Sequence, residues 1–421
     1  MCKVKILLIV SFIANHFHHA TTENYEEQFP DEKEKKSIDN FIAGETKSFL
    51  DKLNKKREEE NKDKITMEQI QDDTQVTQEN EILIDILNNF STTLQAQNKQ
   101  RGEKIEYIEI GKKKYCYKIK IEAKNGIMFT SDTHAEADKV EKIWYFFDQL
   151  KKQEKVDKLI FLGDYGDRGE YWTYTYFLLA AMAEKYGEDI IFIRGNHEQI
   201  EIALEYSGAV SWAICDNPKC TNNCWDEMPV ICDIAWNKKK IFCSHGAMPL
   251  NKNGEWLEYK EDALTQTYFL ANWNENIFTN NPERRIEKSS RGTGYEIPIK
   301  KIFANMVNKG YDWSIHGHVH KNQCGILTTK NKRVVTVVAN EYYYNCNKTP
   351  FLPAVYIIND DNPNGTFFNL LQKPNDKIKD LYKEDPTNKE VQNNCIIYKY
   401  DFKIDCNTRK KICCCCDICE K

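Results

Sequence analysis

Short polar clusters in the middle of the chain carry side chains of the types that bind divalent metals. The seven candidate ligands are carboxylates, one amide and imidazoles: Asp132, His134, Asp164, Asn196, His245, His318 and His320. Carboxylate oxygen, amide oxygen and imidazole nitrogen suit borderline-hard divalent ions such as Mn, Fe or Zn. Seven ligands exceed what one tetrahedral ion takes. They suffice for two ions that lie about 3.5–4 Å apart and share one carboxylate.

Two ions held in this way favour the hydrolysis of phosphate esters. They lower the pKa of a water between them and clamp the oxygens of a group that undergoes in-line displacement. The reaction also needs a proton for the leaving group, which His197, beside Asn196, can supply. Arg168 and Arg291 have the charge and geometry to hold phosphate oxygens through paired hydrogen bonds.

The polar clusters must be brought together by the elements that precede them. Each follows a short apolar run, and these runs are predicted strands at 126–130, 158–162, 189–193, 241–243 and 313–315. Helices are predicted at 171–186 and 299–306, and further strands at 334–338, 354–358 and 395–400. Strands alternating with helices indicate an α/β fold, in which ligands bind beyond the carboxyl ends of the strands.

The ordered motifs resemble those of the calcineurin-like metallophosphoesterase superfamily, and within it the Ser/Thr phosphoprotein phosphatases. The motifs are DTH at 132–134, GDYGDRG at 163–169, GNHE at 195–198, SHG at 244–246 and GHVH at 317–320. Weaker similarities are Trp273-Asn274, Ser290-Arg291-Gly292 and the stretch from Ala339 to Tyr342. The resemblance spans residues 120 to 360 and implies a β-sandwich of mixed sheets flanked by helices.

The resemblance also implies a role for each residue. The implied ligands of the first ion are Asp132, His134 and His320, those of the second are Asn196, His245 and His318, and Asp164 bridges both. The implied general acid is His197, paired with Asp167, and the implied phosphate ligands are Arg168 and Arg291.

The chain departs from the family pattern next to these ligands. Ser131 and Ala135 stand where the family has glycines around its first motif, and Ala247 replaces the second glycine of the family's HGG. The departures keep the ligands and leave the substrate class open. His316 is interpreted as structural.

The sequence thus favours a dinuclear-metal phosphomonoesterase of the Ser/Thr protein phosphatase type, in which metal-bound hydroxide attacks phosphorus directly. The alternative is a phosphoesterase that acts on small molecules such as nucleotides or dinucleotide polyphosphates, because one metal cradle serves both substrate classes. A non-catalytic binding scaffold fits less well, since such a protein would be expected to lose ligands first.

Composition excludes several other classes. The chain has 421 residues, 41% of them hydrophobic, which excludes a fully disordered protein. Its 59 basic and 64 acidic residues nearly cancel, so no nucleic-acid partner is expected. The apolar run from Ile6 to Ala14 is too short to span a bilayer, and no transmembrane segment is expected.

Four regions are predicted along the chain. Lys3 and Lys5 before the apolar run are typical of a signal peptide at 1–20, so we expect a secreted or secretory-lumen protein, with a cytoplasmic location as the alternative. A charged, partly helical appendage at 21–104 precedes a catalytic domain at 105–360, and 361–421 is an extension with a Cys-rich tail. The chain has 16 cysteines, several of which would pair if it is secreted.

Overall fold

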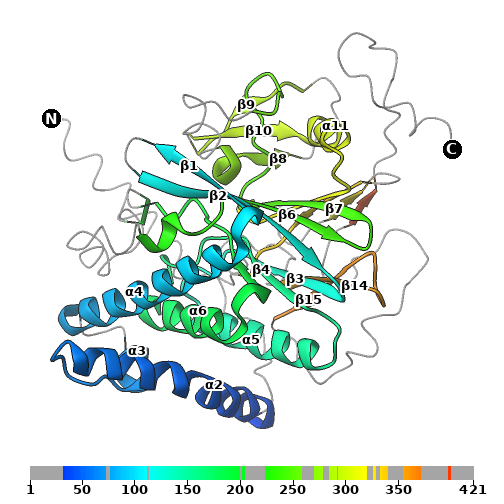
Figure 1. The fold of residues 1–421 in the computed structure, drawn as a ribbon. Helices are drawn as coiled ribbons and strands as arrows, with labels where there is room; N and C mark the ends of the chain where they lie inside the picture. The colour runs from blue at the N-terminus through cyan, green and yellow to red at the C-terminus, as the bar shows by residue number, and fades with distance from the viewer. Residues whose placement is uncertain are drawn as a thin grey trace, which may run out of the picture.

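Two mixed β-sheets pack face to face and are flanked by helices in the computed structural model (Figure 1). The structure describes residues 32–72, 76–110, 113–169, 171–199, 202–203, 223–257, 270–277, 284–291, 293–319, 326–328, 332–339, 354–370 and 397–399. The smaller of the two sheets has the order β15 (Thr366–Asn369), β14 (Ala354–Asn359), β3 (Gly126–Thr130), β4 (Lys158–Phe161) and β5 (Ile190–Phe192). Strands β3, β4 and β5 are parallel, and β14 is antiparallel to β3.

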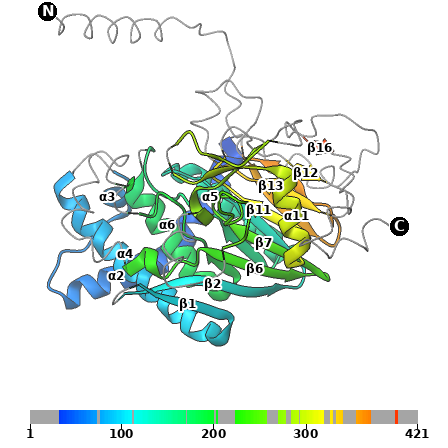
Figure 2. The same ribbon diagram turned by 90° about the horizontal axis from the view of Figure 1, so that it is seen from above.

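The larger sheet has eight strands, most of which can be followed in Figure 2. Its order is β1 (Ile105–Ile110), β2 (Lys113–Ala123), β6 (Ile231–Trp236), β7 (Lys239–Ser244), β11 (Trp313–His316), β13 (Arg333–Thr336), β12 (Ile326–Thr328) and β16 (Ile397–Lys399). Strands β7 and β11 are parallel neighbours. A separate small sheet contains β8 (Glu275–Ile277), β10 (Tyr295–Pro298) and β9 (Glu287–Lys288).

Alternation along the strands builds the core between the two large sheets. In β3, Ile127 and Phe129 belong to the cluster between the sheets, whereas Met128 belongs to the cluster beneath the helices. Successive side chains of a strand point to opposite faces of the sheet. A fully apolar strand such as β3 therefore contributes side chains both to the core between the sheets and to the core under the helices. The outer face of the large sheet is covered by α11 (Ile299–Lys309), whose Phe303 shares a cluster with Phe242 of β7.

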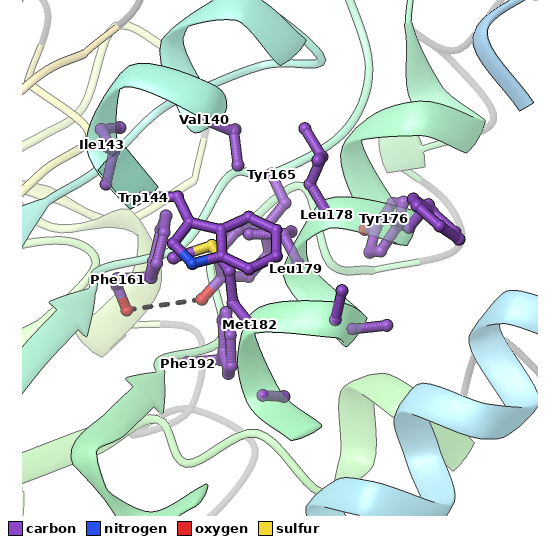
Figure 3. Close-up of a cluster of buried hydrophobic side chains, with 14 of the residues drawn as sticks. Val140, Ile143, Trp144, Phe161, Tyr165, Tyr176, Leu178, Leu179, Met182 and Phe192 are labelled. Atoms are coloured by element: carbon purple, nitrogen blue, oxygen red, sulfur yellow. Dashed lines mark hydrogen bonds between the residues drawn. The ribbon is translucent and has the colours of Figure 1, made fainter. Parts of the chain in front are cut away.

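Helices α5 (Ala137–Lys152) and α6 (Trp172–Tyr186) cover the outer face of the smaller sheet. Figure 3 shows their side chains, Trp144 and Met182 among them, gathered around Phe161, Tyr165 and Phe192. Most of α6 is buried on all sides because a second helical layer lies on it. That layer contains α2 (Glu32–Glu59), α3 (Met67–Gln71) and α4 (Val76–Arg101).

The α2–α4 layer shares one continuous hydrophobic cluster with α5, α6 and the smaller sheet. Phe90 of α4 is fully buried and meets Phe192 of β5 edge to face, with ring centroids 5.0 Å apart. The layer therefore contributes to the stability of the sheet that it covers.

Truncation of Phe90 measures this contribution. We expect Phe90→Ala to lower the free energy of unfolding by about 3–5 kcal/mol, because it removes a fully buried ring and leaves a cavity. Thr92→Ala, an exposed position on the same helix, should change the free energy by less than about 0.5 kcal/mol. Denaturant unfolding of the full chain checks both values, and equal effects would contradict the shared core.

The expected α/β fold of mixed sheets flanked by helices is confirmed, and helix is present in the N-terminal region. No helix in the described part of the chain has the length and apolarity needed to cross a bilayer. The cysteines that the structure describes, Cys116, Cys224, Cys232 and Cys243, are buried free thiols. The proposed signal peptide and the Cys-rich tail lie outside the described residues.

Candidate metal centre

The candidate ligands lie in loops at the carboxyl ends of five strands. The loops follow β3, β4 and β5 of the smaller sheet and β7 and β11 of the larger one. Because strands within each set are parallel, their carboxyl ends meet at one edge of the sandwich. Asp132, Asp164, Asn196, His245 and His318 are all buried there.

Asp164 is the centre of the cluster. It belongs to two groups of potential ligands, one with His134 and His197 and the other with His245 and His318, and the ligand atoms of each group lie within 4.8 Å of one another. Asp164 Oδ2 lies 3.1 Å from His245 Nε2 and 3.7 Å from His134 Nε2. One carboxylate between two sets of imidazoles is the arrangement that two divalent ions with a bridging ligand require.

The polar atoms of His318 support the fit of a metal. Both of its ring nitrogens are buried, and neither makes a hydrogen bond with any described residue. Unpaired buried polar atoms cost about 1–3 kcal/mol each, and a bound cation would remove that cost. The imidazole packs edge to face against His245 and Trp273, at centroid distances of 5.1 and 5.7 Å.

Ser131, at a family glycine position, orients Asp132. The Ser131 hydroxyl donates to Asp132 Oδ2 at 2.6 Å, and the His318 backbone N–H donates to the same oxygen at 3.0 Å. These two bonds fix the carboxylate and connect the loop after β3 to the loop after β11. The serine therefore adds a hydrogen bond that a glycine would lack.

Asp167 orients two imidazoles at once. Its Oδ1 accepts a hydrogen bond from His134 Nδ1 at 2.8 Å, and its Oδ2 accepts one from His197 Nδ1. Both rings consequently present Nε2 to the interior of the site. Burial opposes ionisation of Asp167, but the hydrogen bonds from His134 and His197 outweigh it and lower the pKa of the carboxyl.

His245 is oriented by the backbone. Its Nδ1 donates to Leu162 O at 2.8 Å, and its Nε2 lies 2.9 Å from Asn196 Oδ1. Burial disfavours the imidazolium, but the adjacent Asp164 carboxylate outweighs burial and raises the pKa of His245 to about 9. Metal binding must displace that proton, since only neutral imidazole is a ligand.

Glu198 is a buried carboxylate beside the candidate ligands that the sequence indicates only as part of the GNHE motif. Its carboxylate accepts backbone N–H bonds from Asp164 and Gly195 at 2.8 Å and from Tyr165 at 3.0 Å. Burial, followed by the charge of Asp164, raises the pKa of Glu198 to about 7. Glu198 thus joins the loops after β4 and β5 and fixes the backbone at Asp164.

The two candidate phosphate ligands lie beside the metal ligands. Arg168 Nη2 is 3.0 Å from His197 Nε2. Arg291 Nε pairs with Glu275 Oε1 at 3.2 Å, and its Nη2 donates to His318 O at 3.3 Å. The Arg291 side chain is 28% exposed, so its guanidinium reaches the rim of the site.

The loops of the site hold their ligands in an uncommon backbone conformation. Positive φ values between 44° and 61° occur at the non-glycine residues Asp132, His134, Ala135, Asp164, Asp167, Arg168 and His318. Such residues cost about 1–3 kcal/mol each and persist where the surroundings determine them. At Ala135 the family glycine would adopt its φ of 57° without that cost.

His316 and His320 are the two other histidines of the region. His316 is buried, its Nδ1 donates to Gly317 O at 2.9 Å, and burial lowers its pKa to about 4. A neutral, hydrogen-bonded ring agrees with the structural role expected for His316. His320 lies outside the described residues.

Gly195 provides a test of the packing between Glu198 and Asp164. A Cβ at position 195 would lie 2.6 Å from Glu198 Oε2 and closer than van der Waals contact to Asp164 Oδ1. We expect Gly195→Ala to weaken Mn²⁺ binding by at least about tenfold, because the methyl group displaces both carboxylates. Gly44→Ala in α2 is the control, since nothing lies within 4 Å of its Cβ and its φ is not positive. Calorimetric titration with Mn²⁺ checks this, and equal affinities in both variants would contradict it.

Comparison with known proteins finds several to which part of this chain is similar. Residues 126–322 match the model of the calcineurin-like phosphoesterases. The serine/threonine-protein phosphatase 4 catalytic subunit of Kluyveromyces lactis is 32% identical over 102 residues, 22% of this chain and 30% of that protein. A candidate serine/threonine-protein phosphatase of Caenorhabditis elegans is 26% identical over 137 residues, 30% of this chain and 34% of that protein. The chain thus spans about a third of these relatives.

Among solved structures, a protein serine/threonine phosphatase from Saccharomyces cerevisiae is similar with a TM-score of 0.47 and 14% identity. The similarity covers 70% of this chain and 91% of that one.

Proposed function

We propose, from the premise that residues 126–322 form a calcineurin-like phosphoesterase domain, that the protein is a dinuclear-metal phosphomonoesterase of the Ser/Thr protein phosphatase type. One observation carries the proposal. Asp164 is shared by two groups of buried potential ligands, and His197, a member of one of them, has its Nδ1 held by Asp167. These groups are the candidates for binding two ions, and His197 is the candidate acid beside them.

The residues divide between the two ions. Asp132, whose Oδ1 lies 3.9 Å from His134 Nε2, would hold the first ion with His134 and His320. Asn196, whose Oδ1 lies 2.9 Å from His245 Nε2, would hold the second with His245 and His318. Asp164 would hold both. When bound, the ions supply Lewis acidity and a water of lowered pKa. The protein fixes these side chains through Asp167, Leu162 and Glu198.

His197 would protonate the leaving oxygen of the ester. Its Nδ1 donates to Asp167, so Nε2 is the atom that faces the site, and the carboxylate stabilises the imidazolium. The Arg168 guanidinium reaches the same Nε2, which puts the acid and a phosphate ligand at one corner. Arg291 would hold phosphate oxygens from the opposite side, close to His318.

Phosphate release from two substrate classes tests the proposal. The purified full chain with Mn²⁺ is given phosphoserine and phosphothreonine peptides and, in parallel, a dinucleotide polyphosphate. We expect faster release from the peptides and no release after chelation of the metal. Preference for the dinucleotide would favour the small-molecule alternative, and release from neither substrate with Mn²⁺, Fe²⁺ or Zn²⁺ would contradict a hydrolase.

A further inference from the structure

The last turns of α4 carry two buried amide side chains that leave the helix in different directions. Gln97 Nε2 donates to Ala183 O of α6 at 2.8 Å. Asn98 Nδ2 donates to Glu227 O at 2.9 Å and lies 3.0 Å from Glu227 Oε2. Gln97 therefore joins two helices, whereas Asn98 joins α4 to the segment 223–230 that leads into β6.

The segment 223–230 in turn holds Arg194, at the end of β5. Asp226 Oδ1 pairs with Arg194 Nη1 at 2.8 Å, and Pro229 O accepts the Arg194 backbone N–H at 2.9 Å. The two side chains of the ion pair are only 7% and 13% exposed. A shielded pair of this kind fixes both backbones more firmly than a solvated surface pair.

Arg194 continues the connection to the metal ligands. Its Nε donates to Glu198 O at 3.0 Å, so Arg194 closes the loop that carries Asn196 and His197. The Glu198 carboxylate accepts the backbone N–H of Asp164 at 2.8 Å. The contacts thus run without a break from Asn98 through Glu227, Asp226, Arg194 and Glu198 to the bridging ligand.

Arg101 supports the same connection at the start of β5. Its Nη1 donates to Asn98 Oδ1 at 3.1 Å, which orients that amide, and its Nη2 donates to Ile190 O at 3.1 Å. The C-terminal turn of α4 consequently fixes the first residue of β5 and, through segment 223–230, the loop beyond its last residue.

We propose that Asn98 is a positioning residue for the metal site. Helix α4 would then be part of the catalytic unit, although it lies outside residues 126–322, which match the calcineurin-like phosphoesterase model. This role rests on the proposed function only where hydrolysis is measured. Loss of the Asn98 bond frees segment 223–230, shifts Arg194 and Glu198, and displaces Asn196 and His197. Displacements of about 1 Å at a catalytic group can cost about 100-fold in rate.

Gln97 and Asn98 form a matched pair for the test. Asn98→Ala and Gln97→Ala, in the full chain, each delete a buried amide and its bonds to a carbonyl, so both should lower Tm. Only Asn98→Ala should weaken Mn²⁺ binding, by about tenfold or more, as other residues that orient metal ligands do. With p-nitrophenyl phosphate at saturating Mn²⁺, Asn98→Ala should lower kcat and leave KM within about twofold.

Asp226→Ala breaks the same connection at a later step without touching α4. It removes the Arg194 ion pair and should reproduce the weaker Mn²⁺ binding and lower kcat, even if Asn98→Ala fails to fold. The proposal is overturned if the Mn²⁺ affinity of Asp226→Ala stays within about twofold of the affinity of Gln97→Ala, and the affinity of Asn98→Ala, where that variant folds, does the same. Because the Mn²⁺ titration requires no turnover, this result is distinct from a failure of the phosphatase proposal.

Discussion

Asp164→Asn is expected to remove most of the bound metal and to lower the rate of ester hydrolysis by at least about 10³-fold, or about 4 kcal/mol at the transition state. Asp164 Oδ2 faces imidazole nitrogens of both ligand groups, at 3.1 Å from His245 and 3.7 Å from His134. An asparagine has the same shape and can still accept the His197 backbone N–H that Asp164 Oδ1 accepts. The fold should therefore survive, while the charge that two cations would share is lost.

Asp157→Asn is the matched control for that substitution. The Asp157 carboxylate accepts the backbone N–H groups of Lys124, Asn125 and Gly126 at 3.0–3.1 Å, at the opposite end of β3 from the metal site. Its change should lower stability by about 1–2 kcal/mol and leave metal content and kcat near wild type. Metal analysis by mass spectrometry, together with phosphate release, separates the variants. Full metal content in folded Asp164→Asn would remove Asp164 from the ligand set.

Much of the fold could be predicted because the central strands are short, fully apolar and followed directly by polar residues. The predicted strand at 126–130 coincides with β3, and the helix predicted at 171–186 differs from α6 by one residue. Strand β2 was missed because Lys118 and Lys120 alternate with Tyr117, Ile119 and Ile121, so no continuous apolar run marks it. No predicted strand covered β1 or β6 either.

The candidate site could be predicted as a list of side chains but not as a network. The structure brings His134, Asp164 and His197 into one group of potential ligands, and Asp164, His245 and His318 into a second. Hydrogen bonds from a side chain to a backbone carbonyl cannot be predicted from motifs, because every residue has a backbone carbonyl and its residue type does not show which one accepts. The connection from Asn98 to Arg194 also joins residues almost a hundred positions apart, through backbone oxygens of Glu227 and Pro229.

His197→Ala is expected to affect substrates according to their leaving group. For an alkyl phosphate, whose leaving oxygen needs a proton, kcat should fall by about 10²–10⁴-fold. For p-nitrophenyl phosphate, whose leaving group departs as a stable anion, the loss should be less than about tenfold. The reason is the position of Nε2, which the Nδ1 bond to Asp167 turns into the site. Steady-state kinetics on the two esters, with the same enzyme preparation, makes each substrate the control for the other.

Metal content decides between the two roles that the geometry offers His197. The ring also belongs to a potential ligand group with His134 and Asp164, and its Nε2 lies 3.8 Å from Asp164 Oδ2. If His197 is the acid, the alanine variant should retain both ions, because the proposed ligands Asp132, His134 and Asp164 are unchanged. An equal fall in kcat for both esters, accompanied by loss of one ion, would make His197 a ligand. The proton would then have to come from another group or from solvent.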